Sequence, residues 1–235
     1  DWALAIAVDA SGNVYVTGLS VGSGNNGDYA TIKYNASGAQ QWVARYNGPG
    51  NDDDGATAIA VDASGNVYVT GSSWGSGTYD DYATIKYNAS GAEQWVARYN
   101  GPGNSWDLAT AIALDASGAL DVSVYVTGSS IGSGTYSDYA TIKYNSFGQQ
   151  QWVARYNGSG NSFDQAMAIA VDKSGNVYET GVSDGGPGAF YDYATIKYNA
   201  SGTKQWVARY NGPGNAFDGA GAIAVDASGN VYVTG

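Results

Sequence analysis

The chain has 235 residues and a formal net charge of −11 at pH 7, and 43% of its residues are hydrophobic and 13% aromatic. An acidic chain repels polyanions, which argues against a nucleic-acid partner, and no apolar stretch reaches the length needed for membrane insertion. The absence of cysteine and histidine excludes zinc sites built on those residues, cysteine nucleophiles and a serine–histidine–aspartate triad.

A pattern of four short apolar segments recurs along the chain. In one copy the segments are AIAVD at 58–62, NVYVTG at 66–71, YATIKYN at 82–88 and QWVARYN at 94–100. Because Val, Ile, Thr, Tyr and Trp suit a pleated surface, each segment predicts a β-strand, and none has helical periodicity. The connectors DASGN and NASG predict tight hairpin turns.

The copies follow one another at a nearly constant period. The first segment ends at five aspartates that lie 53 to 57 residues apart, namely Asp9, Asp62, Asp115, Asp172 and Asp226. Four strands in such a period are typical of a propeller blade, so we predict an all-β fold, a β-propeller of four-stranded antiparallel blades. Residues 1–235 would form one propeller domain or part of one, with repeats at about 1–53, 54–106, 107–163 and 164–217 and a half repeat at 218–235.

The segments DASGNVYVTG at 62–71, DYATIKY at 81–87 and QW at 94–95 resemble the bacterial SBBP repeat, named for a seven-bladed β-propeller. The resemblance extends over essentially the whole chain and implies a secreted or cell-surface protein, without a defined activity. Because the last two strands occur four times, seven blades cannot form from this chain. We expect a piece of a longer repeat protein, with a smaller ring as the alternative, and self-association through open blade edges.

Charged residues recur at the same place in every copy, as Asp81, Lys86 and Arg98 do in the second. One interpretation is a row of anion sites. The interpretation that we favour is a structural ion pair or cross-strand contact in each blade, because identical placement suits a role in the architecture.

Three adjacent carboxylates at Asp52, Asp53 and Asp54 form the densest acidic run. Carboxylate oxygens are ligands of Ca²⁺, so the run is a candidate calcium site. Neighbouring side chains of an extended segment point apart, which favours a solvated acidic loop instead. We expect no other cofactor or metal.

The copies differ most in the loop between the second and third strands and in the link between repeats. In an antiparallel blade these connectors lie at the same end, which we call the variable face. Aromatic rings among Gly, Ser, Asn and Asp indicate a ligand-binding surface, and the alternative is that they fill grooves between blades. The candidate residues are Trp74, Tyr79, Trp106, Tyr136, Phe163, Phe190, Tyr191 and Phe217.

These observations predict a non-catalytic repeat scaffold or binding module that presents aromatic loops on one propeller face to a protein or glycan ligand. A multivalent, lectin-like carbohydrate-binding propeller is the alternative. A glycan-cleaving enzyme that uses aspartates is less expected, because such enzymes need a specific pair of carboxyl groups. Only two glutamates occur, Glu93 and Glu179, and most aspartates are repeated.

Overall fold

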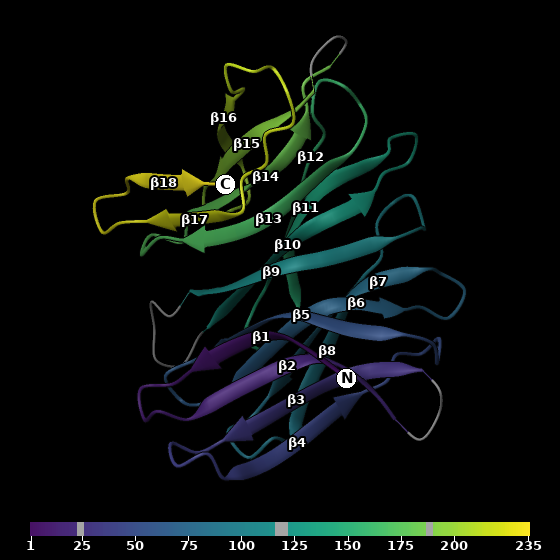
Figure 1. The fold of residues 1–235 in the computed structure, drawn as a ribbon, viewed down its shortest axis with the longest axis vertical. Coiled ribbons are helices and arrows are strands. Elements are labelled where there is room, and N and C mark those ends of the chain that lie inside the picture. Colours follow the sequence, from purple (N-terminus) through teal and green to yellow (C-terminus); the bar gives the residue numbers. More distant parts are fainter. Residues whose placement is uncertain (23–25, 116–121, 187–189) are drawn as a thin grey trace. The chain divides into compact units, whose positions relative to one another are not determined.

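A computed structural model describes residues 1–22, 26–115, 122–186 and 190–235. These residues form strands and turns, and within these ranges there is no helix that could span a membrane. The strands form four four-stranded sheets and one two-stranded sheet, in which neighbours in the chain lie side by side (Figure 1). The predicted all-β fold of four-stranded antiparallel blades is confirmed.

Each sheet is one blade. Blade 1 consists of β1 (Trp2–Val8), β2 (Val14–Val21), β3 (Gly27–Tyr34) and β4 (Gln40–Tyr46). Blade 2 consists of β5 (Asp54–Val61), β6 (Val67–Trp74), β7 (Asp80–Tyr87) and β8 (Glu93–Tyr99). Blade 3 consists of β9 (Asp107–Asp115), β10 (Ser123–Ile131), β11 (Ser137–Tyr144) and β12 (Gln150–Tyr156). Blade 4 consists of β13 (Asp164–Val171), β14 (Val177–Asp184), β15 (Tyr191–Tyr198) and β16 (Lys204–Tyr210), and blade 5 of β17 (Ala222–Val225) and β18 (Val231–Thr234).

The chain divides into two compact units. The first comprises residues 1–100 and 104–112, and the second comprises 101–103 and 113–235. The first unit therefore contains the complete interface between blades 1 and 2, and the second contains the interface between blades 3 and 4.

The turn between the first two strands of a blade is built on its aspartate. In blade 1, Asp9 Oδ1 accepts hydrogen bonds of 2.9 Å from the N–H groups of Ser11 and Asn13. Gly12 completes the turn with a φ of 79°. Asp9 Oδ2 accepts further bonds from Asn13 Nδ2 at 2.7 Å and Tyr15 Oη at 2.9 Å. The residues therefore form an Asx-type turn, whose aspartate also anchors a buried tyrosine.

A register shift in the first strand explains one recurring glycine. In blade 2 the pairing of β5 with β6 shifts between Ala56 and Ala58. There the carbonyl of Gly55 comes so close to Gly71 that a Cβ on Gly71 would overlap it. Only glycine fits this approach of two backbones, which accounts for the glycine that follows VYVT in the repeat.

The hydrophobic core lies between neighbouring blades. Blade 1 presents an aromatic face with Tyr15 and Tyr29, and blade 2 covers it with an aliphatic face that includes Val67, Val69 and Ile85. All five side chains are fully buried. The second unit repeats this layer between blades 3 and 4, with Tyr125 and Tyr139 against Val177 and Ile196.

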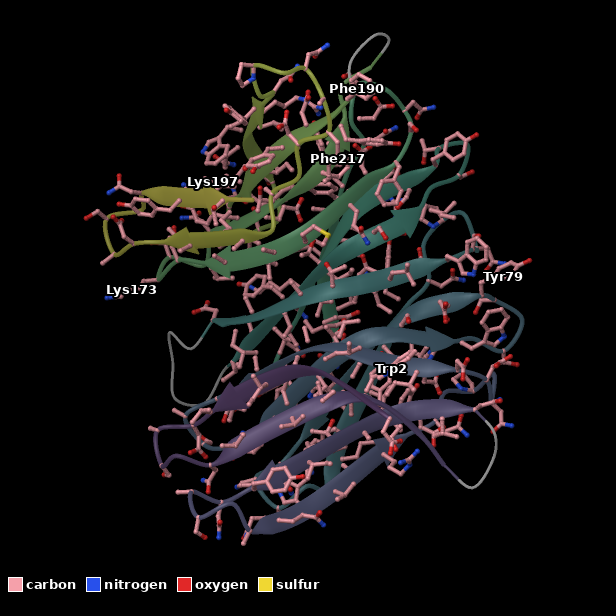
Figure 2. All side chains as sticks on the ribbon, viewed as in Figure 1. Trp2, Tyr79, Lys173, Phe190, Lys197 and Phe217 are labelled. Carbon is pink, nitrogen blue, oxygen red and sulfur yellow. The ribbon has the colours of Figure 1, made fainter. Side chains whose placement is uncertain are left out.

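Blade 1 has a second face, which corresponds to the aliphatic face of blade 2, and this second face is uncovered in the described structure. Trp2 (labelled in Figure 2) and Ile6 are strongly exposed, whereas the matching face of blade 2 is buried. Self-association through such a face stays a prediction.

Candidate functional site

The strand order gathers the variable connectors at one end of each blade. The link at residues 47–53 enters blade 2 at the end where the β6–β7 loop, residues 75–79, also lies. The two tight turns of the blade lie at the other end, because successive antiparallel strands reverse direction. In each four-stranded blade the variable loop and the link that enters the blade therefore lie at the same end.

A buried aspartate holds the link in place. Asp54 is 1% exposed, and its Oδ2 accepts a hydrogen bond of 2.6 Å from the N–H of Gly48 in the link. Its Oδ1 accepts another, of 3.0 Å, from the N–H of Trp74 at the end of β6. Desolvation on burial raises the pKa of Asp54, and these hydrogen bonds oppose that rise. Asp164 makes the same pair of bonds in blade 4.

An asparagine with positive φ bends each link just before this aspartate. The φ values are between 46° and 52° at Asn51, Asn104, Asn161 and Asn215. Asparagine tolerates this left-handed conformation better than other residues with a Cβ, and the Asn47 side chain supports it with a hydrogen bond of 2.8 Å to Asn51 Oδ1. This bend fixes the residue that precedes the aspartate on the variable face. In blade 3 that residue is Trp106, before Asp107.

Three candidate aromatic residues meet in the first unit. The ring centroids of Trp74 and Tyr79 are 5.5 Å apart with an interplanar angle of 76°, and those of Tyr79 and Trp106 are 5.5 Å apart at 64°. Such edge-to-face contacts are favourable for aromatic pairs. Trp74 is half-buried, whereas Tyr79 (labelled in Figure 2) and Trp106 are 47% and 54% exposed. We call these residues the Trp74–Trp106 cluster.

A second set of rings meets in the second unit. The centroid of Tyr191 lies 6.1 Å from that of Phe163 and 5.9 Å from that of Phe217. Phe163 and Phe217 are 40% and 65% exposed, and Phe190, beside Tyr191 in the sequence, is also exposed. Phe190 and Phe217 are labelled in Figure 2. We call Phe163, Tyr191 and Phe217 the Phe163–Phe217 cluster.

The remaining candidate, Tyr136, is strongly exposed and contacts no other ring in the described part of the chain. The structure thus brings six of the eight candidates into two clusters and leaves Phe190 and Tyr136 outside them. Trp106, Phe163 and Phe217 keep solvent-exposed surface, and ligand binding by these rings stays a prediction.

The repeated charges have structural partners. Arg98 Nη2 lies 2.9 Å from Asp81 Oδ2, and Arg98 Nη1 donates hydrogen bonds to Ser73 Oγ at 2.6 Å and Tyr46 Oη at 3.0 Å. The same ion pair occurs as Arg45–Asp28, Arg155–Asp138 and Arg209–Asp192. The repeated lysines lie over tyrosine rings at 5.0 to 5.2 Å, for example Lys86 over Tyr68. The predicted ion pair is confirmed in each of the four four-stranded blades.

The acidic run divides between different partners. Asp52 Oδ1 accepts a hydrogen bond of 2.9 Å from the N–H of Asp53, and Asp53 Oδ1 accepts one of 2.7 Å from the N–H of Gly27. Asp54 is directed into the blade, as described above. Among the described residues no three Asp or Glu side chains converge as metal ligands would. Calcium binding at this run stays a prediction.

Glu179 is a buried group that sequence reasoning did not place. It occupies the position of Val69 and is fully buried between blades 3 and 4. Its carboxylate accepts hydrogen bonds from Thr127 Oγ1 at 2.8 Å, from Tyr198 Oη at 2.9 Å and from Thr141 Oγ1. Desolvation raises its pKa. The signal in the sequence was a titratable residue at an otherwise apolar repeat position.

Comparison with known families identifies the repeat. A family model described as a beta-propeller repeat, SBBP, matches residues 41–77, which run from β4 through the link into β5, β6 and the loop after them. Residues 41–77 therefore match the SBBP beta-propeller repeat, in agreement with the all-β structure of repeated four-stranded sheets. A search of curated proteins found no significant match.

Proposed function

We propose that this chain is a non-catalytic scaffold or binding module that presents aromatic clusters on the variable face of its propeller blades. The observation that carries the proposal is the Trp74–Trp106 cluster, in which three rings meet and two stay about half exposed. It combines a loop with a link, the two connectors that differ between repeats. Fixed rings of this kind bind flat apolar surfaces at a low cost in side-chain entropy.

The chemistry of the surroundings limits the ligand. The connectors carry Gly, Ser, Asn and Asp, which supply small hydrogen-bonding groups beside the rings. The net charge of −11 disfavours a polyanion. A neutral or basic ligand, either a glycan that stacks on the rings or a peptide, fits both features.

The lectin-like alternative draws support from the second cluster. Phe163, Tyr191 and Phe217 place three further rings on the variable face of the second unit. Two weak sites on one chain raise the overall affinity for a repetitive glycan without any new contact. A location outside the cell, which the SBBP resemblance implies, would expose the chain to such glycans.

The buried carboxyl groups support a non-catalytic role. Burial raises the pKa of Asp54, Asp164 and Glu179, a property that general acids share. All three, however, are occupied by hydrogen bonds from backbone N–H groups or hydroxyls inside the blades. Their raised pKa values therefore follow from structural burial. Turnover of a polysaccharide that depends on a single non-repeated aspartate would favour the enzyme alternative instead.

The proposal can be tested by screening the chain against a glycan array and a peptide library. We expect that Trp106→Ala and Phe217→Ala weaken the binding of a captured ligand by about tenfold or more, the effect of removing a central aromatic contact. Phe147→Ala is the matched control, because Phe147 is 77% exposed and lies in a tight turn away from the variable face. Absence of binding in both screens, or equal affinity of all variants, would contradict the proposal.

A further inference from the structure

An aspartate accompanies the Trp74–Trp106 cluster on the variable face of the first unit. Asp80 lies directly opposite Trp74 in the pairing of β6 with β7, and it follows Tyr79 in the chain. Side chains of directly opposed residues in an antiparallel pair project from the same face of the sheet, with Cβ atoms about 4.5–5.5 Å apart. The carboxylate of Asp80 therefore lies on the side of blade 2 that carries the ring of Trp74.

An equivalent contact in the preceding blade places Asp80 beside the link that carries Trp106. In blade 1, Gly27 has the position of Asp80, and its N–H donates a hydrogen bond of 2.7 Å to Asp53 Oδ1. Asp53 has the position of Trp106, because each directly precedes the aspartate that begins the next blade. Tyr79, the neighbour of Asp80 in the chain, also contacts Trp106. Asp80 is thus surrounded by the three rings of the cluster.

The negative charge of Asp80 is not neutralised within the blade. Its carboxylate has no hydrogen-bond or ion-pair partner among the described residues, and Arg98 pairs with Asp81 instead, at 2.9 Å. Burial raises the pKa of Asp80, and the negative charges of Asp54 and Asp81 raise it further. A cation bound beside Asp80 would relieve this repulsion, whereas a neutral ligand would not.

The second unit pairs an aromatic ring with an aspartate in the same way, but with the two positions exchanged. In blade 4, Asp184 lies opposite Tyr191, the ring that both phenylalanines of the Phe163–Phe217 cluster contact. Asp184 also accepts a hydrogen bond of 2.9 Å from the N–H of Gly186, so its carboxylate is partly occupied. The corresponding pairs of blades 1 and 3 have neither a ring nor a carboxylate, namely Val21–Gly27 and Ile131–Ser137. Each aromatic cluster therefore coincides with an aspartate opposite a ring.

We propose, on the basis of the function proposed above, that the Trp74–Trp106 cluster and Asp80 bind an arginine side chain of a peptide. A guanidinium group is planar, so it stacks on an aromatic ring while its N–H groups donate to a carboxylate. The exposed rings of Tyr79 and Trp106 supply the stacking surface, and Asp80 supplies the acceptor. A neutral glycan would use the rings alone.

The test uses the whole chain and a short, fluorescently labelled glycine–serine peptide with one central arginine. The control peptide carries citrulline, which has the shape of arginine without its charge. We expect saturable binding of the arginine peptide and shifts of the indole N–H signals of Trp74 and Trp106 in NMR spectra, with the signal of Trp152 unchanged. The citrulline peptide should bind at least about tenfold more weakly, because hydrogen bonds to charged groups are the stronger ones.

Two variants with the same change in charge separate a specific contact from general attraction to an acidic chain. Asp80→Asn should weaken binding of the arginine peptide by about tenfold or more, with an unchanged melting temperature because Asp80 has no partner inside the blade. Glu93→Gln is the matched control, since Glu93 is exposed and begins β8 at the end of blade 2 away from the variable face. It should bind the peptide as the unmodified chain does. Trp106→Ala should cost about three- to thirtyfold, the effect of a cation–π contact.

Absence of saturable binding, equal binding of the two peptides, or equal effects of Asp80→Asn and Glu93→Gln would overturn the arginine site. The proposed function fails on a different result, which is full affinity of Trp106→Ala for a ligand captured in the screens. If Trp106→Ala weakens binding of such a ligand while the arginine and citrulline peptides bind alike, the aromatic cluster is a binding site but does not select arginine.

Discussion

Tyr198 Oη donates a hydrogen bond of 2.9 Å to the carboxylate of Glu179 in the buried layer between blades 3 and 4. In blade 2 the matching residues are Tyr87 and Val69, and Tyr87 Oη has no hydrogen-bond partner among the described residues. Glu179 therefore satisfies a hydroxyl whose counterpart in blade 2 has no hydrogen-bond partner among the described residues. It does so by placing a titratable group where an apolar one normally packs.

We expect Glu179→Val to stabilise the chain at pH 7. The substitution restores the residue of blade 2, where Val69 is fully buried. Burial penalises the ionised form of Glu179, and replacing buried ionisable groups by well-packed apolar side chains often stabilises a protein, by up to about 4 kcal/mol. Urea unfolding at pH 7 measures the difference, and a loss of stability on this substitution would show that the hydroxyl contacts of Glu179 outweigh its desolvation.

The contribution of Glu179 to the stability of the folded chain should depend on pH. Burial raises the pKa of Glu179 in the folded chain above its ordinary value of 4.5. The folded state therefore favours the protonated form, so the contribution of Glu179 to stability is greatest below pH 4.5 and declines as pH rises through the folded pKa. Glu179→Gln removes this dependence. Unfolding midpoints of the two proteins should diverge between pH 4.5 and pH 7, and parallel curves would contradict the assignment.

The aspartates of the Asx-type turns, such as Asp9, should contribute to stability with the opposite pH dependence to that of Glu179. The hydrogen bond from the Asn13 side chain is the largest cause that lowers the pKa of Asp9, to about 2. Its contribution to stability is present above its ordinary pKa of 3.8 and is lost as pH falls toward 2. In a carboxyl NMR titration, Asn13→Ala should raise the pKa of Asp9, whereas Ser11→Ala, which keeps the backbone N–H, should leave it near 2.

The ion pairs offer a matched comparison of burial. The Arg98–Asp81 pair has side chains exposed by 22% and 7%, and the Arg45–Asp28 pair by 37% and 18%. Arg98→Ala should destabilise the chain by about 2 kcal/mol, the scale of hydrogen bonds to charged groups. Arg45→Ala should cost less, because solvent screens its charge more. Thermal unfolding of both variants tests this ranking, and equal losses would refute the role of burial.

Excess chelator should leave the melting temperature unchanged. The carboxylates of Asp53 and Asp54 are already engaged by the backbone N–H groups of Gly27, Gly48 and Trp74. A structural Ca²⁺ would need those oxygens as ligands. A fall in melting temperature with chelator, restored by added Ca²⁺ and absent in Asp53→Asn, would establish a calcium site at the run.

Much of the fold could be predicted because each local feature of the repeat has one structural solution. The alternation in YATIKYN fits a strand, and the aspartate and glycine of DASGN fit an Asx turn with positive φ. The repeated arginine and aspartate fit an ion pair that recurs inside each four-stranded blade, since identical residues in equivalent surroundings form the same contact. These predictions needed no knowledge of how blades pack.

The candidate site was harder to predict, because contacts between a loop and a link depend on tertiary structure. The sequence identified Tyr79 and Trp106 as unusual, but it did not indicate that their rings meet. It placed Asp54 in a solvated acidic run, whereas the structure buries it as the anchor of the link. Spacing along the chain cannot show whether Asp54 is solvated or buried, since its burial depends on which backbone amides fold back toward its carboxylate.

Repeated residues build the blades, and we propose that variable aromatic residues bind the ligand. Comparing Trp42→Ala with Trp106→Ala tests it most directly, because both remove a tryptophan of the first unit. Trp42 packs against Tyr15 and Tyr87, so its loss should destabilise the chain by about 2–3 kcal/mol.

For each variant, the melting temperature and the affinity for a ligand captured in the screens are measured together. We expect a lower melting temperature with retained affinity for Trp42→Ala, and an unchanged melting temperature with affinity reduced by about tenfold for Trp106→Ala. A Trp106→Ala protein that melts as early as Trp42→Ala and still binds with full affinity would contradict it.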